Sequence, residues 1–181
     1  MGLTMVLDPT GTDGRDGKDV READLESLSG KTVGIRHDKL WESFDWVTSE
    51  WHKALEAEGA NVVLWRSTER NGKDGDEVTE RFNEFVGSVD AVVSGLATCG
   101  SCTMLTVSDA VSAAQRGLPA VAVCTTQFEP LAHMLATRDG RPNLKMVVLP
   151  FPLETRPEDE VRDIARKAFG SLKEALGVVS S

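Results

Sequence analysis

Five short runs of apolar and β-branched residues alternate with five runs whose apolar residues recur every three or four positions. This alternation predicts an α/β protein, because strands that are joined through helices pair in parallel. Right-handed crossovers between such strands favour the order 2-1-3-4-5. The sequence therefore predicts a doubly wound, flavodoxin-like, mainly parallel five-stranded sheet.

The first half of the predicted domain holds two strands and two helices. The first strand, Lys31–Arg36, follows the turn Ser29-Gly30, and the second, Asn61–Trp65, follows Gly59, which fits a helix C-cap. Spacings of three or four residues on one face predict the two helices. Their apolar residues are Phe44, Val47, Trp51, Ala54 and Leu55 in the first, and Val78, Phe82, Phe85 and Val86 in the second.

The second half repeats the pattern three times. Strands are predicted at 90–94, Ala120–Cys124 and Lys145–Leu149, and a helix at Met104–Arg116 follows the first of them. The last helix begins at Thr155–Glu158, which has the sequence of a capping box with proline in the first turn. The apolar residues of the two remaining helices are Phe128, Leu131 and Leu135, then Val161, Ile164, Ala168, Phe169, Leu172 and Leu176.

The 181 residues are enough for one domain with a sizeable core. Residues 1–29 are predicted to form an N-terminal arm or loop, because Thr12–Lys18 holds two Asp-Gly turn dipeptides and almost no apolar residue. Residues 30–181 then form a single α/β domain.

Composition excludes several classes of function. The chain has 20 Lys and Arg against 29 Asp and Glu, a net charge of −9, and no basic cluster, which argues against nucleic-acid binding. No apolar run approaches the roughly 20 residues that span a bilayer. The N-terminus lacks the pattern of a secretory signal. These observations predict a cytoplasmic protein that binds neither nucleic acid nor membrane.

The cysteines and histidines do not form a metal-binding pattern. Three cysteines without a secretory signal do not indicate a disulfide framework. The histidines are scattered, without the spacing of a zinc site. Glycine-rich nucleotide signatures are also missing, so no cofactor and no metal is predicted. The residues concerned are Cys99, Cys102 and Cys124, with His37, His52 and His133.

Cys99-Gly100-Ser101-Cys102 lies between a predicted strand and a predicted helix. At a helix N-terminus the backbone N–H groups and the helix dipole favour a thiolate over a thiol. Cys99 is therefore the predicted nucleophile or redox thiol. Cys102 would resolve an adduct at Cys99 or pack beneath the turn, and Ser101 is a candidate N-cap.

Further polar residues follow the neighbouring strands, and the carboxyl ends of parallel strands share one edge of the sheet. His37 would deprotonate Cys99, or remain a solvated loop histidine. Asp38 would orient that imidazole, bind a polar substrate or cap a helix. The remaining predicted substrate-binding residues are Gly100, Ser101, Thr103, Cys124 and Thr125, with a buried apolar role as the alternative for Cys124 and helix capping for Thr125.

Three side chains outside the cysteine turn are also assigned from their spacing. Asp109 follows Cys102 by seven residues, but is expected to be a solvent-facing helix acid. Trp41 and Trp46 do not fit the apolar face of their helix, so a pocket mouth or a dimer contact is predicted for them.

The block Gly95–Cys124 resembles the UGSC family, named for a Sec-Gly-Ser-Cys motif in which cysteine can occupy the first position. The matching residues are Cys99-Gly100-Ser101-Cys102-Thr103, Asp109–Val111, Arg116–Val121 and Cys124-Thr125, and Leu7–Gly11, Leu28–Gly34 and Val147–Pro152 also look like that family. The same block is similar to the selenoprotein subunit of glycine and betaine reductases, with its Sec-Gly-Thr-Cys-Thr motif. The resemblance implies that Cys99 occupies a selenocysteine position, which favours a reactive role.

Three functions are compatible with these features. The first is a cysteine-dependent enzyme in which Cys99 attacks a small electrophilic or sulfur-containing substrate. The second is a cofactor-independent lyase, isomerase or racemase acting on a small carboxylate, because Asp/Glu racemases place cysteines beyond strands in related folds. The third is a subunit of a reductase complex that is inactive alone. The expected partner is a small-molecule substrate, with a homodimer or a partner protein as further options.

Overall fold

The computed structural model of the protein describes residues 21–66 and 75–179. Its five strands are all parallel and lie in the order β2-β1-β3-β4-β5, which confirms the predicted flavodoxin-like sheet. The carboxyl ends of all five strands therefore point to one edge. The strands are β1 (Thr32–His37), β2 (Asn61–Arg66), β3 (Ala91–Ala97), β4 (Ala120–Thr125) and β5 (Lys145–Leu149).

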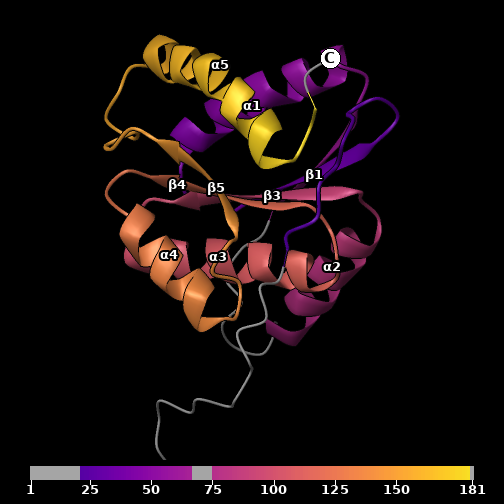
Figure 1. Ribbon diagram of the computed structural model, residues 1–181. Helices are drawn as coiled ribbons and strands as arrows, with labels where there is room; N and C mark the ends of the chain where they lie inside the picture. Colours follow the sequence, from indigo (N-terminus) through magenta and orange to yellow (C-terminus); the bar gives the residue numbers. More distant parts are fainter. Residues whose placement is uncertain (1–20, 67–74, 180–181) are drawn as a thin grey trace, which may run out of the picture.

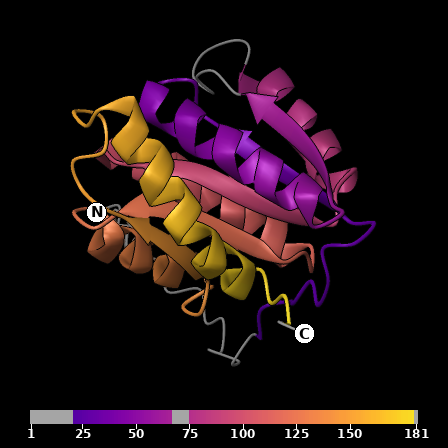
Figure 2. The ribbon, with the colours of Figure 1, turned by 90° about the horizontal axis from the view of Figure 1, so that it is seen from above.

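Helices cover both faces of the sheet (Figure 1). One face carries α1 (Glu42–Ala57) and α5 (Glu158–Ala175), which lie side by side in the view from above (Figure 2). The other face carries α2 (Gly75–Gly87), α3 (Gly100–Gln115) and α4 (Glu129–Arg138). Two separate apolar cores result, one on each side of the sheet.

Successive side chains of β1 point alternately to the two faces of the sheet, and so to the two cores. Val33 and Ile35 lie in the core beneath α1 and α5. His37 follows them at the same period of two, and its ring centroid lies 4.9 Å from that of Phe44 on α1. Arg36 points to the opposite face, toward α3.

The segment 21–29 belongs to the core rather than only to the surface. Leu25 and Leu28 are buried beside α5, and the Leu25 N–H donates to the Leu176 carbonyl at 2.8 Å. The part of the predicted arm from residue 21 onward is thus packed against the C-terminal end of the domain. Residues 1–20 of that arm lie outside the described residues.

Two predicted helix caps are wrong. Cys99, not Ser101, is the N-cap of α3, so that helix begins four residues before the predicted Met104. The capping box before α5 does not form, because Pro157 is the N-cap and makes no side-chain capping bond. Thr155 precedes this cap by two residues, too far back for its hydroxyl to serve the first turn. Across the described residues, no helix has both the length and the apolar character to cross a membrane.

Candidate active site

The cysteine turn joins β3 to α3 at the carboxyl edge of the sheet. Cys99 and Cys102 form a disulfide with an S–S distance of 2.11 Å. The Cys102 N–H also donates to the Cys99 Sγ at 3.1 Å, so Cys99 caps the helix with its sulfur. Gly100 and Ser101 are exposed, and the Ser101 Oγ lies 3.5 Å from the Cys99 Sγ. The turn therefore presents a sulfur atom to backbone and hydroxyl donors.

The two sulfurs differ in their access to solvent. Cys99 is half-buried, whereas Cys102 is only 3 % exposed and packs under the first turn of α3. A thiolate at Cys99 would accept the Cys102 N–H at the positive end of the helix dipole, which stabilises the charged form. The geometry thus favours Cys99 as the attacking sulfur and Cys102 as the inner, resolving sulfur.

Two predicted substrate-binding threonines hold the turn from below. Thr103 Oγ1 donates to the Cys99 carbonyl at 2.5 Å, and Thr125 Oγ1 lies 3.4 Å from both the Ala97 carbonyl and Thr98 Oγ1. Both Thr103 and Thr125 are fully buried. Their hydroxyls fix the backbone on either side of Cys99, whereas Gly100 and Ser101 form its exposed surface.

The imidazole of His37 is not directed toward the cysteine turn. It lies on the α1 side of β1, where Nδ1 accepts the Lys39 N–H at 2.9 Å and Nε2 lies 3.4 Å from Asp45 Oδ1. Burial lowers the pKa of His37 to about 4, with Arg66 and Arg36 adding to the effect and Asp45 opposing it. His37 is thus a neutral, buried histidine at pH 7, and neither of its predicted roles describes this position.

Asp38 directly follows His37, the last residue of β1, and is buried. Its Oδ1 accepts the Leu40 N–H at 3.2 Å, an Asx-type turn that starts the loop into α1. Burial raises the pKa of Asp38, partly offset by the N–H groups of Leu40 and Leu96 and by the charge of Arg36. Leu96 precedes Cys99 by three residues, so the Asp38 carboxyl lies near the end of β3 that leads into the cysteine turn.

Cys124 is fully buried at the end of β4, in the core formed with α3 and α4. Burial, and secondarily the charge of Glu129, raises the pKa of the Cys124 thiol to about 12. Such a thiol is protonated at any physiological pH, so Cys124 matches the apolar alternative rather than substrate binding.

Asp109 is not a solvent-facing acid, as its position on the helix had suggested. It is buried, and its Oδ2 lies 2.7 Å from the Nε of Arg36, whose side chain is 2 % exposed. Arg36 Nη1 also donates to the Gly95 carbonyl at 3.0 Å. This pair joins β1, β3 and α3 just below the cysteine turn. The sequence signal for this buried ion pair is a single acidic residue on a helix face whose other residues are small or apolar.

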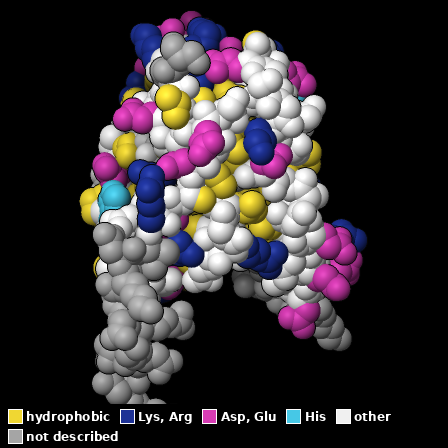
Figure 3. Space-filling view, turned by 45° about the vertical axis from the view of Figure 1, so that its right-hand side comes forward, with side chains coloured by type: hydrophobic (Ala, Val, Ile, Leu, Met, Phe, Trp, Pro, Cys, Tyr) yellow, Lys and Arg dark blue, Asp and Glu magenta, His cyan; other side chains and the backbone are white. Residues whose placement is uncertain are grey.

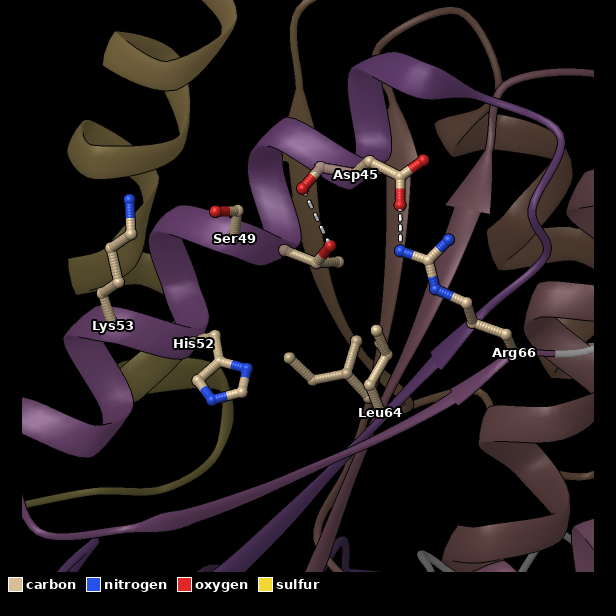
Figure 4. Close-up of a pocket in the computed structure, with 8 residues that line it drawn as sticks. Asp45, Ser49, His52, Lys53, Leu64 and Arg66 are labelled. Atoms are coloured by element: carbon tan, nitrogen blue, oxygen red, sulfur yellow. Dashed lines mark hydrogen bonds and ion pairs between the residues drawn. The ribbon is translucent and has the colours of Figure 1, made fainter.

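A separate cavity of about 340 Å³ lies between α1 and the edge strand β2, which sequence reasoning did not anticipate. In Figure 4 the ion pair of Asp45 and Arg66 closes one end, and the His52 ring points toward Leu64. This cavity is on the α1 side of the sheet, away from the start of α3. On the face shown in Figure 3, acidic and basic side chains are interspersed around hydrophobic ones, without a continuous basic stripe.

Trp41 and Trp46, for which a pocket mouth or dimer contact was predicted, pack partly buried against the core beneath α1. Within residues 21–66 and 75–179, no three His, Cys, Asp or Glu side chains come together to hold a metal ion.

Comparison with known families identifies the chain. The UGSC family model matches residues 5–178, nearly the whole sequence. The chain belongs to the UGSC family. Cys99-Gly100-Ser101-Cys102 is the part of this UGSC protein that carries the motif of the family name. No curated protein matches the sequence.

Three solved structures resemble this UGSC protein at low identity. A mutant flavo di-iron protein from Thermotoga maritima is 14% identical, with a TM-score of 0.48, and the match covers 83% of this chain and 37% of that one. A putative D-3-phosphoglycerate dehydrogenase from Ralstonia solanacearum is 17% identical (TM-score 0.38, coverage 83% and 46%). A flavone reductase is 17% identical (TM-score 0.40, coverage 83% and 66%). The UGSC chain thus spans less than two thirds of each.

Proposed function

We propose that this protein is a cysteine-dependent redox enzyme that reduces a small sulfur-containing substrate through a dithiol–disulfide cycle. The observation that carries the proposal is the Cys99–Cys102 disulfide at the N-terminus of α3, with one half-buried and one buried sulfur. A pair that can close within one helical turn can store and deliver two electrons. A purely structural disulfide would instead be expected to join distant segments.

The cycle begins with both cysteines reduced. The Cys99 thiolate attacks one sulfur of a substrate disulfide, forming a mixed disulfide and releasing the first thiolate. Cys102 then attacks the Cys99 Sγ, closes the internal disulfide and releases the second thiolate, so two electrons pass from the protein to the substrate. An external dithiol restores the reduced form and is itself oxidised.

Selective alkylation tests the role of Cys99. The reduced protein is treated with iodoacetamide across a pH series, and each cysteine is followed by peptide mass spectrometry. We expect Cys99 to react fastest, with an apparent pKa below the free-thiol value of about 8.5, because the helix N-terminus stabilises its thiolate. Cys124 serves as the internal control, since its buried thiol with a pKa of about 12 should react only after unfolding.

Two variants separate catalysis from structure. Cys99→Ser should abolish the reduction of a small aryl disulfide, whereas Cys102→Ser should release one thiolate and then stop at the mixed disulfide. A Cys99 apparent pKa at or above about 8.5, together with full disulfide reduction by Cys99→Ser, would refute the proposed function.

The lyase or racemase alternative gains no support from the geometry. It needs a second acid–base group facing Cys99, and the two candidates are the buried Cys124 and His37 on the α1 side of the sheet. We also propose a cytoplasmic location, because a redox-active pair needs a reducing compartment to complete its cycle.

A further inference from the structure

Arg36 places a positive charge in the interior of the domain, between the sheet and α3. Its side chain is 2 % exposed, and a guanidinium in such a position costs free energy unless hydrogen bonds and an opposite charge satisfy it. Two of its partners, the Gly95 carbonyl and the Asp109 carboxylate, belong to β3 and α3, the elements that the cysteine turn connects. Arg36 therefore contacts the chain both before and after the turn.

Before the turn, Arg36 holds the irregular end of β3. Its Nη1 donates to the Gly95 carbonyl at 3.0 Å, four residues ahead of Cys99. The register of β3 with β4 shifts between Ser94 and Ala97, so Gly95 lies where the regular ladder is interrupted. Irregularities of this kind change the direction of a strand and are common beside active sites. The guanidinium thus fixes a carbonyl from which the chain continues toward Cys99.

After the turn, Arg36 holds α3. Its Nε lies 2.7 Å from Asp109 Oδ2, and the Asp109 side chain is 1 % exposed. Asp109 follows Cys102 by seven residues, or about two helical turns, so the two residues lie on the same face of α3. Because the helix between them is continuous, an anchor at Asp109 fixes the depth and rotation of α3, and with them the position of Cys102.

The position of one sulfur relative to the other determines how readily the bridge closes. Cys99 lies between the end of β3 and the first turn of α3, whereas Cys102 belongs to α3 itself. Groups that are held in contact react as if their concentration far exceeded that of free thiols, and a small displacement removes much of this advantage. A residue that contacts both β3 and α3 opposes such a displacement.

We propose that Arg36 is a positioning residue for the disulfide cycle, and that it keeps the Cys102 sulfur within reach of Cys99 by holding Gly95 and Asp109 together. This role rests on the proposed dithiol–disulfide cycle. In the mixed disulfide, the Cys102 thiolate attacks the Cys99 Sγ and forms the internal S–S bond. The bond between Cys99 and the substrate sulfur breaks, and the substrate thiolate leaves with the electron pair. Arg36 forms none of these bonds and acts only on where the two sulfurs lie.

Two-phase kinetics test the proposal on the reduced full-length protein. One equivalent of a chromogenic aryl disulfide releases one thiolate as Cys99 attacks, then a second as Cys102 closes the bridge. The double variant Arg36→Met with Asp109→Leu replaces both charges by apolar groups. It should slow the second phase about ten- to hundredfold and the first by no more than about twofold, because only closure needs both sulfurs.

The equilibrium between the bridge and glutathione is a second readout, which a purely structural role would not change. Two glutathione thiols reduce the bridge and become glutathione disulfide, so the equilibrium constant reports how well the turn holds the two sulfurs together. In the double variant this constant should shift about tenfold toward the dithiol, which corresponds to a reduction potential about 30 mV higher.

Arg141 provides the matched control. It donates to the Ala114 carbonyl at 2.8 Å and lies 3.5 Å from Glu22, so it too joins a carbonyl to a carboxylate, but at the far end of α3. Arg141→Met with Glu22→Leu should change neither kinetic phase, and it should leave the glutathione equilibrium at the value of the unsubstituted protein.

A folded double variant of Arg36 and Asp109 with an unchanged second phase and an unchanged glutathione equilibrium would overturn the positioning role and leave the dithiol cycle intact. A first phase that survives in Cys99→Ser would instead overturn the cycle itself. Arg36→Lys covers the case in which the double variant does not fold. It keeps the charge beside Asp109 but lacks the planar fork that serves two acceptors, so it should slow the second phase at least about threefold. A second phase at the normal rate in Arg36→Lys would contradict the proposal.

Discussion

Removing the charge of Asp109 should destabilise the fold strongly, because it leaves the Arg36 guanidinium buried beside a neutral amide. The side chains of the pair are 2 % and 1 % exposed, and their nearest charged atoms lie 2.7 Å apart. Breaking such a buried pair from one side costs about 3–5 kcal/mol. For a domain of this size, that loss lowers the thermal midpoint by about 6–20 °C.

The assay is chemical and thermal unfolding of Asp109→Asn, followed by circular dichroism with the disulfide intact. Asp163→Asn is the matched control, because Asp163 also pairs with a basic residue, Lys167 at 2.6 Å, but both side chains are exposed. The control should leave the midpoint unchanged, since exposed pairs contribute little.

A double substitution decides whether the charge or the packing matters. Arg36→Met together with Asp109→Leu removes both charges and fills the space with apolar groups, so it should recover most of the lost stability. A free energy of unfolding for Asp109→Asn within about 0.5 kcal/mol of that of the unsubstituted protein would refute the reasoning. It would mean that the Arg36 charge reaches solvent or another acid.

Two further predictions concern the residues around the first and third strands. His37 keeps a folded-state pKa of about 4 against an ordinary 6.5, so its contribution to stability is complete above pH 6.5 and falls by about 3 kcal/mol as the pH drops toward 4. Urea unfolding at several pH values should show this loss, and a His37→Gln variant with the same pH slope would contradict it. Gly95→Ala should destabilise by about 1–3 kcal/mol, because a methyl group there overlaps the Phe44 ring. Gly100→Ala, which meets no atom within 4 Å, is the control; equal midpoints for both alanine variants would count against this packing argument.

The sequence predicts most of the fold because helices and strands leave periodic signals. Spacing identifies the five strands and the turn that carries Cys99 and Cys102, and the right-handed crossover rule predicts the strand order. The ends of the helices were harder to predict from the sequence. Cysteine is not among the usual N-cap residues, and its capping role depends on the contact of the Cys99 Sγ with the Cys102 N–H. The disulfide itself does not follow from the sequence, because two nearby cysteines are equally compatible with free thiols.

Side-chain direction was the information that the sequence lacked at the candidate site. His37 is the last residue of β1 and Asp38 is the first residue after it, so adjacency in the sequence does not give the two side chains a common direction. The topology rule brought both to the carboxyl edge but did not separate them. The structure places His37 against Phe44 of α1, whereas the Asp38 carboxyl accepts the Leu40 N–H and is also stabilised by the Leu96 N–H. A histidine was the more familiar proton acceptor for a cysteine, and the face of the sheet decided against it.

The buried pair of Arg36 and Asp109 links the stability of the domain to the chemistry of the cysteine turn. A buried ion pair is expected to contribute less stability than well-packed apolar residues of the same volume. Here the pair ties α3 to β1 and β3. The double variant Arg36→Met with Asp109→Leu should therefore fold well and still slow the closure of the disulfide by Cys102, because Arg36 Nη1 would no longer hold the Gly95 carbonyl of the strand that leads into the turn. Normal closure in that stable variant would show that the pair supports the fold alone.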